Sequence, residues 1–205
     1  MLFSLSRLRP QQLYPSVRIL PLLLAAALLS GCGVNTIPTL EEQAKAAWGQ
    51  VQNQYQRRAE LIPNLVETVR GYAKQEREVL TQVIEARAKA TQVQVNVDQL
   101  TDPEALRRFQ EAQSQLSGAL GRLIAVSENY PDLKSNQNFL ALQSQLEGTE
   151  NRISVARRDY IQAVQAYNTE VRTLPGRLWA VVYGAKPMAT FTVAEEQQRP
   201  PQVRF

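Results

Sequence analysis

The strongest constraint on the fold is a long, regularly spaced run of mostly apolar residues in the last third of the chain. Successive members are three or four residues apart, which places them on one stripe of an α-helix that faces a neighbouring helix in coiled-coil-like packing. Pro175-Gly176 then ends the run. The pattern predicts one long helix. Its stripe consists of Phe139, Leu142, Leu146, Thr149, Ile153, Ala156, Tyr160, Val164, Tyr167, Val171 and Leu174.

Two earlier stretches carry the same spacing. The first runs from Leu40 to about Thr91 and follows Thr39-Leu40-Glu41-Glu42, which matches a capping box. The second starts at Asp102-Pro103, a cap followed by proline at the first helical position, and continues to a turn at 129–131. Because short connections favour antiparallel neighbours, we predict an all-α fold, an antiparallel up-and-down bundle of three long helices.

Pro63 is the irregular point of the first predicted helix. Inside a helix, proline removes a backbone hydrogen bond and clashes with the preceding turn, at a cost of about 3 kcal/mol. The apolar stripe nevertheless stays in phase from Tyr55 to Leu65. We therefore predict a continuous helix that is kinked near Pro63; a break there would give four helices.

The amino terminus has the three parts of an export signal. Three arginines precede an apolar run from Ile19 to Leu29, and Leu29-Ser30-Gly31-Cys32 follows. The run is about half the roughly 20 residues that a membrane-spanning helix needs. Its ending resembles the bacterial lipobox, whose cysteine is acylated and becomes the first mature residue. The alternatives are an ordinary signal peptide or an unprocessed anchor, with Cys32 incidental. We predict a lipoprotein signal peptide over 1–31 and a lipid on Cys32, the chain's one cysteine.

The rest of the chain divides into a tether over 32–38, a helical bundle over 39–175 and a carboxy-terminal segment over 176–205. The six tether residues after Cys32 reach about 20 Å at most, which would hold the bundle close to a bilayer. The apolar stretch 178–184 is expected to pack over the bundle end, with a bilayer contact through Trp179 and Tyr183 or a partner site as alternatives. Residues 195–205 are polar and are expected to form a loose tail.

Composition excludes several classes of function. The formal charge of +4 comes mostly from residues 1–31, which contain three arginines and no acid; the remainder has 20 basic and 19 acidic side chains. That balance argues against a nucleic-acid partner. The chain has no histidine and one cysteine, which removes the commonest general base, the imidazole metal ligand and histidine-activated nucleophiles. We expect no metal, no cofactor and no enzymatic activity.

Some polar residues fall at positions that the apolar stripes turn toward the core, namely Arg58, Glu76, Gln113, Ser127 and Thr149. One interpretation places them at the edge of the core, with the arginine stem lying along apolar surface. The other is a set of buried polar layers that fix the register of the helices.

Several motifs together resemble the LemA family of bacterial helical proteins. They are RRAELIPNLV at 57–66, GYA at 71–73, ARA at 86–88, YPDLKSN at 130–136, TEN at 149–151, Tyr160 and Tyr167-Asn168. The resemblance runs from about Leu40 to Phe205. It implies long antiparallel helices held to a membrane by an amino-terminal segment, and no established reaction. It also adds Asn151 and Asn168 as structural residues that bond backbone or neighbouring helices.

The chain departs from the family pattern in two places. Many relatives have a longer spanning helix at the amino terminus, whereas this chain has a lipobox. Tyr160 is followed by Ile161 where the family often has asparagine, which removes an amide that would cap or bridge helices.

These features favour a lipid-anchored, extracytoplasmic scaffold or adaptor of the bacterial cell envelope, with other envelope proteins or further copies as partners. Whether the inner or the outer membrane receives it stays open. The alternative is a membrane-remodelling or envelope-stress-sensing protein that acts on lipid, although the near-neutral mature charge disfavours strong binding to anionic lipid.

Overall fold

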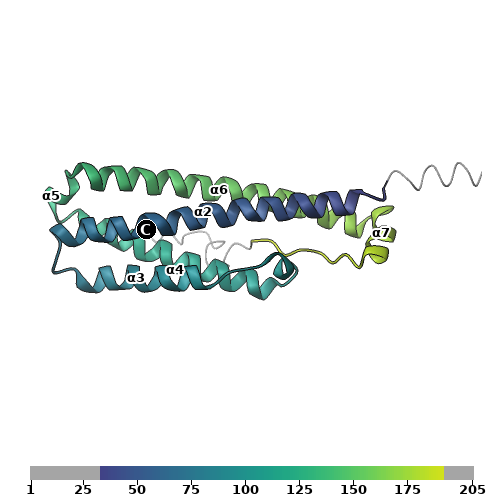
Figure 1. The fold of residues 1–205 in the computed structure, drawn as a ribbon, viewed down its shortest axis with the longest axis horizontal. Coiled ribbons are helices and arrows are strands. Elements are labelled where there is room, and N and C mark those ends of the chain that lie inside the picture. Colours follow the sequence, from purple (N-terminus) through teal and green to yellow (C-terminus); the bar gives the residue numbers. More distant parts are fainter. Residues whose placement is uncertain (1–32, 192–205) are drawn as a thin grey trace, which may run out of the picture.

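The computed structural model describes residues 33–191 and confirms an all-α, antiparallel bundle (Figure 1). The predicted signal peptide, Cys32 and the tail over 195–205 lie outside the described residues. Within the described range the elements are α2 (Thr36–Tyr72), α3 (Arg77–Gln92), the short 3-10 helix η1 (Val97–Gln99), α4 (Pro103–Ser127), α5 (Pro131–Lys134), α6 (Gln137–Arg172) and α7 (Gly176–Tyr183).

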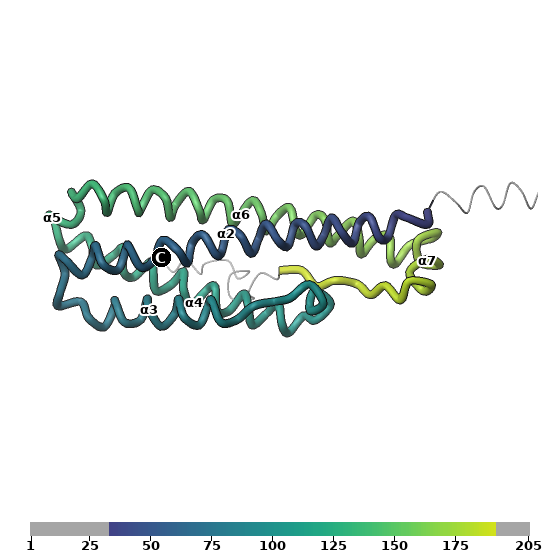
Figure 2. The backbone as a smooth tube through the Cα atoms, in the orientation of Figure 1, coloured from purple at the N-terminus to yellow at the C-terminus, as the bar shows by residue number. Residues whose placement is uncertain are grey.

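The two longest helices, α2 and α6, run antiparallel and side by side for nearly the whole length of the bundle (Figure 2). The helix predicted around the stripe 139–174 is therefore confirmed as α6. The shorter helices α3 and α4 pack against each other beside this pair, and α5 closes the turn from α4 to α6. Asp102 accepts a hydrogen bond from the Glu104 backbone N–H at 2.9 Å, which confirms the predicted cap of α4.

The predicted end of the first helix, near Thr91, is wrong. The helix stops at Tyr72, and a turn over 73–76 reverses the chain into α3, so the bundle has four long helices. Pro63 lies inside α2 and does not break it. Ala73 leaves helical geometry at φ −123° and ψ 57°, two residues after Gly71, which favours helix poorly. The apolar spacing continues past the turn because α3 also buries one face, so periodicity did not reveal the reversal.

The start of this helix also differs from the prediction. Helix α2 begins at Thr36 with Asn35 in the cap position, so Thr39 and Glu42 lie inside the helix and form no capping box at its start. Ile37 is buried in the core, and Pro38 is tolerated in the first turn, where its missing N–H would have no helical partner. Of the described part of the predicted tether, only residues 33–35 precede the helix.

A contact from α3 explains how α2 passes through Pro63. Proline has no N–H to donate to the carbonyl of Ala59, four residues earlier. The Nε–H of Arg87 donates to that carbonyl at 2.8 Å instead. The backbone acceptor that proline leaves open is thus satisfied from the neighbouring helix, and the two residues are coupled.

The interior contains two separate hydrophobic clusters. The proximal core lies toward residue 33 and includes Ile37, Trp48, Val51, Tyr55, Phe109, Ile153, Tyr160, Val164, Tyr167, Met188 and Phe191. The distal core lies toward the turn at 73–76 and includes Ile62, Leu65, Val69, Leu80, Val83, Leu116, Leu120, Leu123, Leu133, Phe139 and Leu146.

The coupling of Pro63 and Arg87 can be tested by a double-mutant cycle. Arg87→Met keeps the apolar stem but leaves the Ala59 carbonyl unpaired, and should lower the free energy of unfolding by about 1–2 kcal/mol. In a Pro63→Ala background the new backbone N–H can reach that carbonyl, so the same change should be worth less than about 0.5 kcal/mol. Urea unfolding measures both; equal losses in the two backgrounds would contradict the coupling.

Candidate functional site

A buried polar layer separates the two cores. Arg58, Gln113 and Thr149 are buried, with exposed fractions of 1%, 6% and 0%. On each of α2, α4 and α6, this polar residue lies between a residue of the proximal core and one of the distal core. Of the five polar residues that helical phase predicts to face inward, Arg58, Gln113, Ser127 and Thr149 are buried and Glu76 is half-buried.

The Arg58 guanidinium connects α2 to both α4 and α6. One nitrogen, Nη1, donates to Ser117 Oγ and to Glu150 Oε1, each at 2.8 Å. The other, Nη2, donates to Gln113 Oε1 at 2.7 Å and to the Gln113 carbonyl at 3.2 Å. The guanidinium carbon also lies 5.0 Å from the centre of the Tyr55 ring, within the range of a cation–π contact.

Gln113 extends this layer to the fourth helix. Its Nε2 donates to the Ala90 carbonyl at 3.1 Å near the end of α3. A buried charge needs such partners because desolvation otherwise makes it strongly unfavourable. Glu150, whose side chain is 46% exposed, brings the negative charge to the edge of the layer. All four long helices therefore meet at one hydrogen-bonded level.

Glu76, Asn151 and Ser127 lie outside this layer. Glu76 is half-buried at the N-cap position of α3 and accepts a hydrogen bond from the Tyr130 hydroxyl at 2.8 Å, an interaction that raises the pKa of Tyr130. Asn151 is exposed on α6 and belongs to no buried layer. Ser127 and Thr149 direct their hydroxyls to backbone carbonyls of their own helices, so neither hydroxyl donates to another helix.

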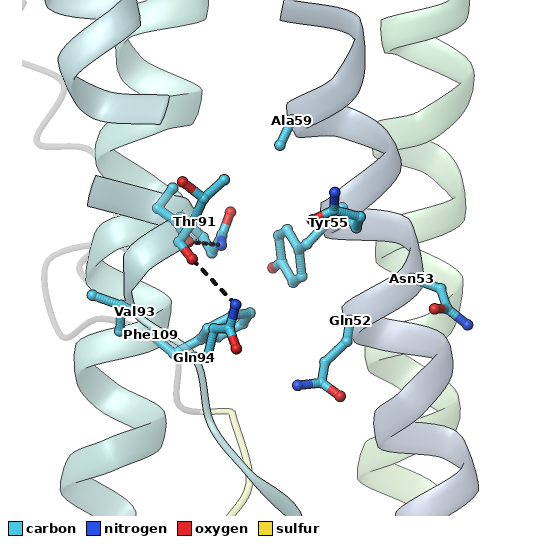
Figure 3. A pocket seen from close by; sticks show the side chains of 11 residues that line it. Gln52, Asn53, Tyr55, Ala59, Thr91, Val93, Gln94 and Phe109 are labelled. Atoms are coloured by element: carbon cyan, nitrogen blue, oxygen red, sulfur yellow. Dashed lines mark hydrogen bonds between the residues drawn. The ribbon is translucent and has the colours of Figure 1, made fainter. Parts of the chain in front are cut away.

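A small pocket lies beside the layer, between α2 and the junction of α3 with α4 (Figure 3). Its volume is about 190 Å³, and Tyr55, Gln52, Gln94 and Gln113 are among the residues that line it. None of the eleven described lining residues carries a formal charge. Burial raises the pKa of Tyr55, which keeps its hydroxyl protonated. The pocket therefore offers amide and hydroxyl hydrogen bonding rather than acid–base chemistry.

Asn168 belongs to a second set of contacts, which holds the carboxy-terminal segment 185–191 against α6. The Asn168 side chain donates to the Met188 carbonyl and accepts from the Met188 N–H, both at 2.8 Å. Tyr160 donates to the Ala189 carbonyl at 2.9 Å, and Tyr167 to the Lys186 carbonyl at 3.1 Å. Burial raises the pKa of both tyrosines, so they remain donors. We call this set the carboxy-terminal clasp.

The clasp fills a gap left by α3. That helix ends at Gln92 and covers only the distal half of the bundle. In the proximal half its place is taken by the segment 93–100 and by residues 185–191, which share a backbone hydrogen bond from Ala189 to Leu100 at 2.8 Å. Trp48 completes this half by donating to the Val95 carbonyl at 3.0 Å.

The last helix, α7, lies at the proximal end beside the first described residues. The Tyr183 hydroxyl donates to the Val34 carbonyl at 3.1 Å, and the indole of Trp179 lies against Gly33. The turn into α7 requires glycine at position 176, because a Cβ there would lie 2.3 Å from the Glu170 carbonyl oxygen. Residues 178–184 thus lie at the bundle end, where Ala180 is buried but Leu178, Val181 and Val182 stay exposed, while 185–191 return along α6.

These features define an elongated helical bundle held together by buried hydrogen-bonded layers. Among residues 33–191, no group of acidic or cysteine side chains is arranged to hold a metal ion. In the same range, none of the helices combines the length and the apolar character needed to cross a bilayer.

The profile of the LemA family matches residues 47–205, and the chain belongs to that family. Magnetosome protein MamQ 2 of Paramagnetospirillum magneticum is 26% identical over 168 residues, which are 74% of this chain and 62% of that protein. Magnetosome protein MamQ of Magnetospirillum gryphiswaldense is 24% identical over 173 residues, 77% of this chain and 64% of the relative. Protein LemA of Metamycoplasma hominis is 25% identical over 123 residues, 60% and 52% of the two chains. The chain spans less than two thirds of the length of each of these relatives.

Sequence reasoning missed Glu150 as the partner of Arg58, and it missed the clasp. The family motifs contained a signal for both, since Glu150 is part of the TEN motif, and Tyr160, Tyr167 and Asn168 belong to the same set of motifs. A helical pattern identifies the face of a residue but not a partner 92 positions away in the sequence.

The polar layer can be tested by removing one member or two. Gln113→Leu should lower the free energy of unfolding by about 2–3 kcal/mol, because Arg58 loses an acceptor and the Ala90 carbonyl loses its donor. Arg58→Met combined with Gln113→Leu should be less destabilising than the sum of the single changes, since no buried charge remains. The exposed Gln115→Leu on the same helix is the matched control, expected within about 0.5 kcal/mol of wild type. Additive losses in chemical denaturation would show that the two residues act independently.

Proposed function

We propose that this chain is a lipid-anchored, extracytoplasmic scaffold or adaptor of the bacterial cell envelope, without catalytic activity of its own. The acyl chains attached to Cys32 hold it to a membrane, and the bundle presents helical surfaces to other envelope proteins or to further copies. The observation that carries the proposal is the single cysteine, which follows an export-type segment and stands at the end of Leu-Ser-Gly-Cys.

The start of the fold supports this arrangement. Cys32 precedes Gly33 by one peptide bond, and α2 begins only three residues later at Thr36. Consecutive Cα atoms are about 3.8 Å apart. A lipid on Cys32 would therefore keep the proximal end within a few residues of the bilayer surface, with the long axis of the bundle free to extend away from it.

The absence of enzymatic activity is argued from side-chain chemistry. The chain has no histidine, and the buried polar groups at the centre of the bundle bond one another instead of opening onto the pocket with an acid or a base. Such layers stabilise and align helices. Two of the relatives are named as magnetosome proteins, which fits a role in the assembly of a cellular structure better than in metabolism.

The anchor is tested on protein made in a bacterial host from the full gene. We expect the intact mass of the membrane-extracted protein to correspond to a chain that starts at Cys32 and carries fatty acyl groups, and we expect it to incorporate a labelled fatty acid. Cys32→Ser should incorporate none, whereas Gly31→Ala, a small-for-small change in the same motif, should be processed normally. A mature chain that starts at another residue, or an unmodified Cys32 thiol, would overturn the anchor.

The scaffold role is read out on the same cells. Photo-crosslinkers placed at exposed positions of the distal end should give reproducible adducts with envelope proteins or with a second copy in wild-type membranes. Those adducts should be lost when Cys32→Ser releases the bundle. Reproducible anchoring with no adduct from any position would leave the anchor standing and remove the scaffold role.

A further inference from the structure

The surface of α7 is unusually apolar for a face exposed to water. Leu174, Leu178, Val181 and Val182 are 72%, 64%, 79% and 72% exposed, and Tyr183 is 47% exposed. Leu178, Val181 and Val182 are three and four residues apart, so they share one face of the helix. Ala180 and Gly176 face the bundle and are buried. Leu178, Val181 and Val182 therefore form an exposed apolar face on the outer side of this helix.

The position of this surface indicates what covers it. Tyr183 contacts Val34 and Trp179 contacts Gly33. Cys32 is the residue immediately before Gly33 in the sequence. The apolar face and the acylated residue of the proposed anchor thus lie at the same end of the molecule. A bilayer held this close to α7 by the acyl chains has a high effective concentration. It is therefore the surface most readily available to the apolar face of α7.

The charges near α7 favour the same partner. Between residues 171 and 191 the chain has Arg172, Arg177 and Lys186 and no acidic residue, and all three are exposed. Basic residues around an apolar helical face with tryptophan and tyrosine are typical of helices that lie in the interface of a membrane. The carboxylate of Glu170, at the end of α6, lies against Gly176.

A second copy of the chain fits this surface less well. A stable protein interface usually buries about 800 Å² on each partner, contributed by some 20–30 residues. Five exposed apolar side chains on one short helix and its preceding turn supply a small part of that area. Insertion of a short amphipathic helix into lipid has no such requirement, because the acyl anchor supplies most of the attachment.

We propose that α7 is a membrane foot. Its face formed by Leu178, Val181 and Val182, with Leu174 in the turn before it, inserts into the boundary between headgroups and acyl chains of the bilayer that holds the lipid on Cys32. The proposal rests on the proposed lipid anchor. It adds a second contact that orients the bundle, so that the distal end with the turns at 73–76 and 128–136 points away from the membrane.

The test uses full-length, lipid-modified protein with one added thiol. Because the Cys32 sulfur is acylated, Val181→Cys provides a single site for an environment-sensitive fluorophore. The protein is placed in vesicles of phosphatidylethanolamine and phosphatidylglycerol that contain a shallow nitroxide-labelled lipid. Quenching at position 181 should be about threefold stronger than at Leu140→Cys, an exposed apolar position in the first turn of α6, at the end of that helix away from α7.

Matched variants separate the foot from general hydrophobicity. Leu178→Ser with Val182→Ser should reduce the quenching at position 181 to the level seen at 140, whereas Ile84→Ser with Val155→Ser, which removes exposed apolar side chains elsewhere, should leave it unchanged. Equal quenching at 181 and 140 would overturn the proposal. So would energy transfer between labelled copies without lipid quenching, which indicates a second copy, or a buried signal without vesicles, which indicates another segment of this chain.

Failure of the anchor is distinguishable from failure of the foot. An unacylated Cys32 would take up a second fluorophore and change the labelling ratio from about one to about two, which overturns the anchor whatever the quenching result. Lipid quenching at 181 measured in a Cys32→Ser background would then still support α7 as a membrane contact, and its absence there would overturn both.

Discussion

The structure depends on one buried cation. Arg58 lies in the middle of α2 at 1% exposure, and its guanidinium can remain there only because α4 and α6 present acceptors at the same level. Sliding α4 by one turn would bring Phe109 or Leu116 opposite the charge and leave it without Gln113. The layer therefore disfavours other registers more strongly than apolar packing does, since leucine and isoleucine stripes tolerate a shift of one turn with little loss.

The two halves on either side of the layer are built differently. In the distal half four helices enclose the core, and α3 also donates from Arg87 to the carbonyl that Pro63 leaves open. In the proximal half α3 is absent, and irregular segments 93–100 and 185–191 complete the core. Irregular backbone needs hydrogen-bond partners of its own, and the side chains of Trp48, Tyr160, Tyr167 and Asn168 provide them. The carboxy-terminal segment thereby returns along α6, with α7 left at the end of the bundle beside Gly33.

Much of this architecture could be predicted from the sequence, because it follows from spacing. The stripe of α6, the cap at Asp102 and the inward direction of Arg58 and Gln113 are consequences of helical geometry and local chemistry. The turn at 73–76 could not be found in this way, since its residues include no proline and the apolar phase continues beyond it. Pro63, where the sequence predicts a kink or a break, is accommodated by the side chain of Arg87 from another helix. Such a contact has no signature in the local sequence.

The candidate site divides along the same line. Helical phase identified which polar residues face inward, but the partners of Arg58 and Asn168 come from chain segments that only the fold brings together. Family resemblance predicts Asn151 as a structural residue that bonds backbone or a neighbouring helix, yet it lies on the exposed side of α6. Family motifs therefore indicate where structural hydrogen bonds concentrate, but the partner in each bond follows only from the three-dimensional fold.

The proposed attachment at the proximal end, through a lipid on Cys32 and through α7, predicts a bundle that stands away from the membrane. Neutron reflectometry of the full-length, lipid-modified protein on a supported bilayer measures this orientation directly. Helix α2 has 37 residues, so an upright bundle should give a protein layer about 55 Å thick at 1.5 Å per residue. A layer of about 20–25 Å, the width of two packed helices, would mean that the bundle lies flat on the bilayer and would contradict attachment at one end.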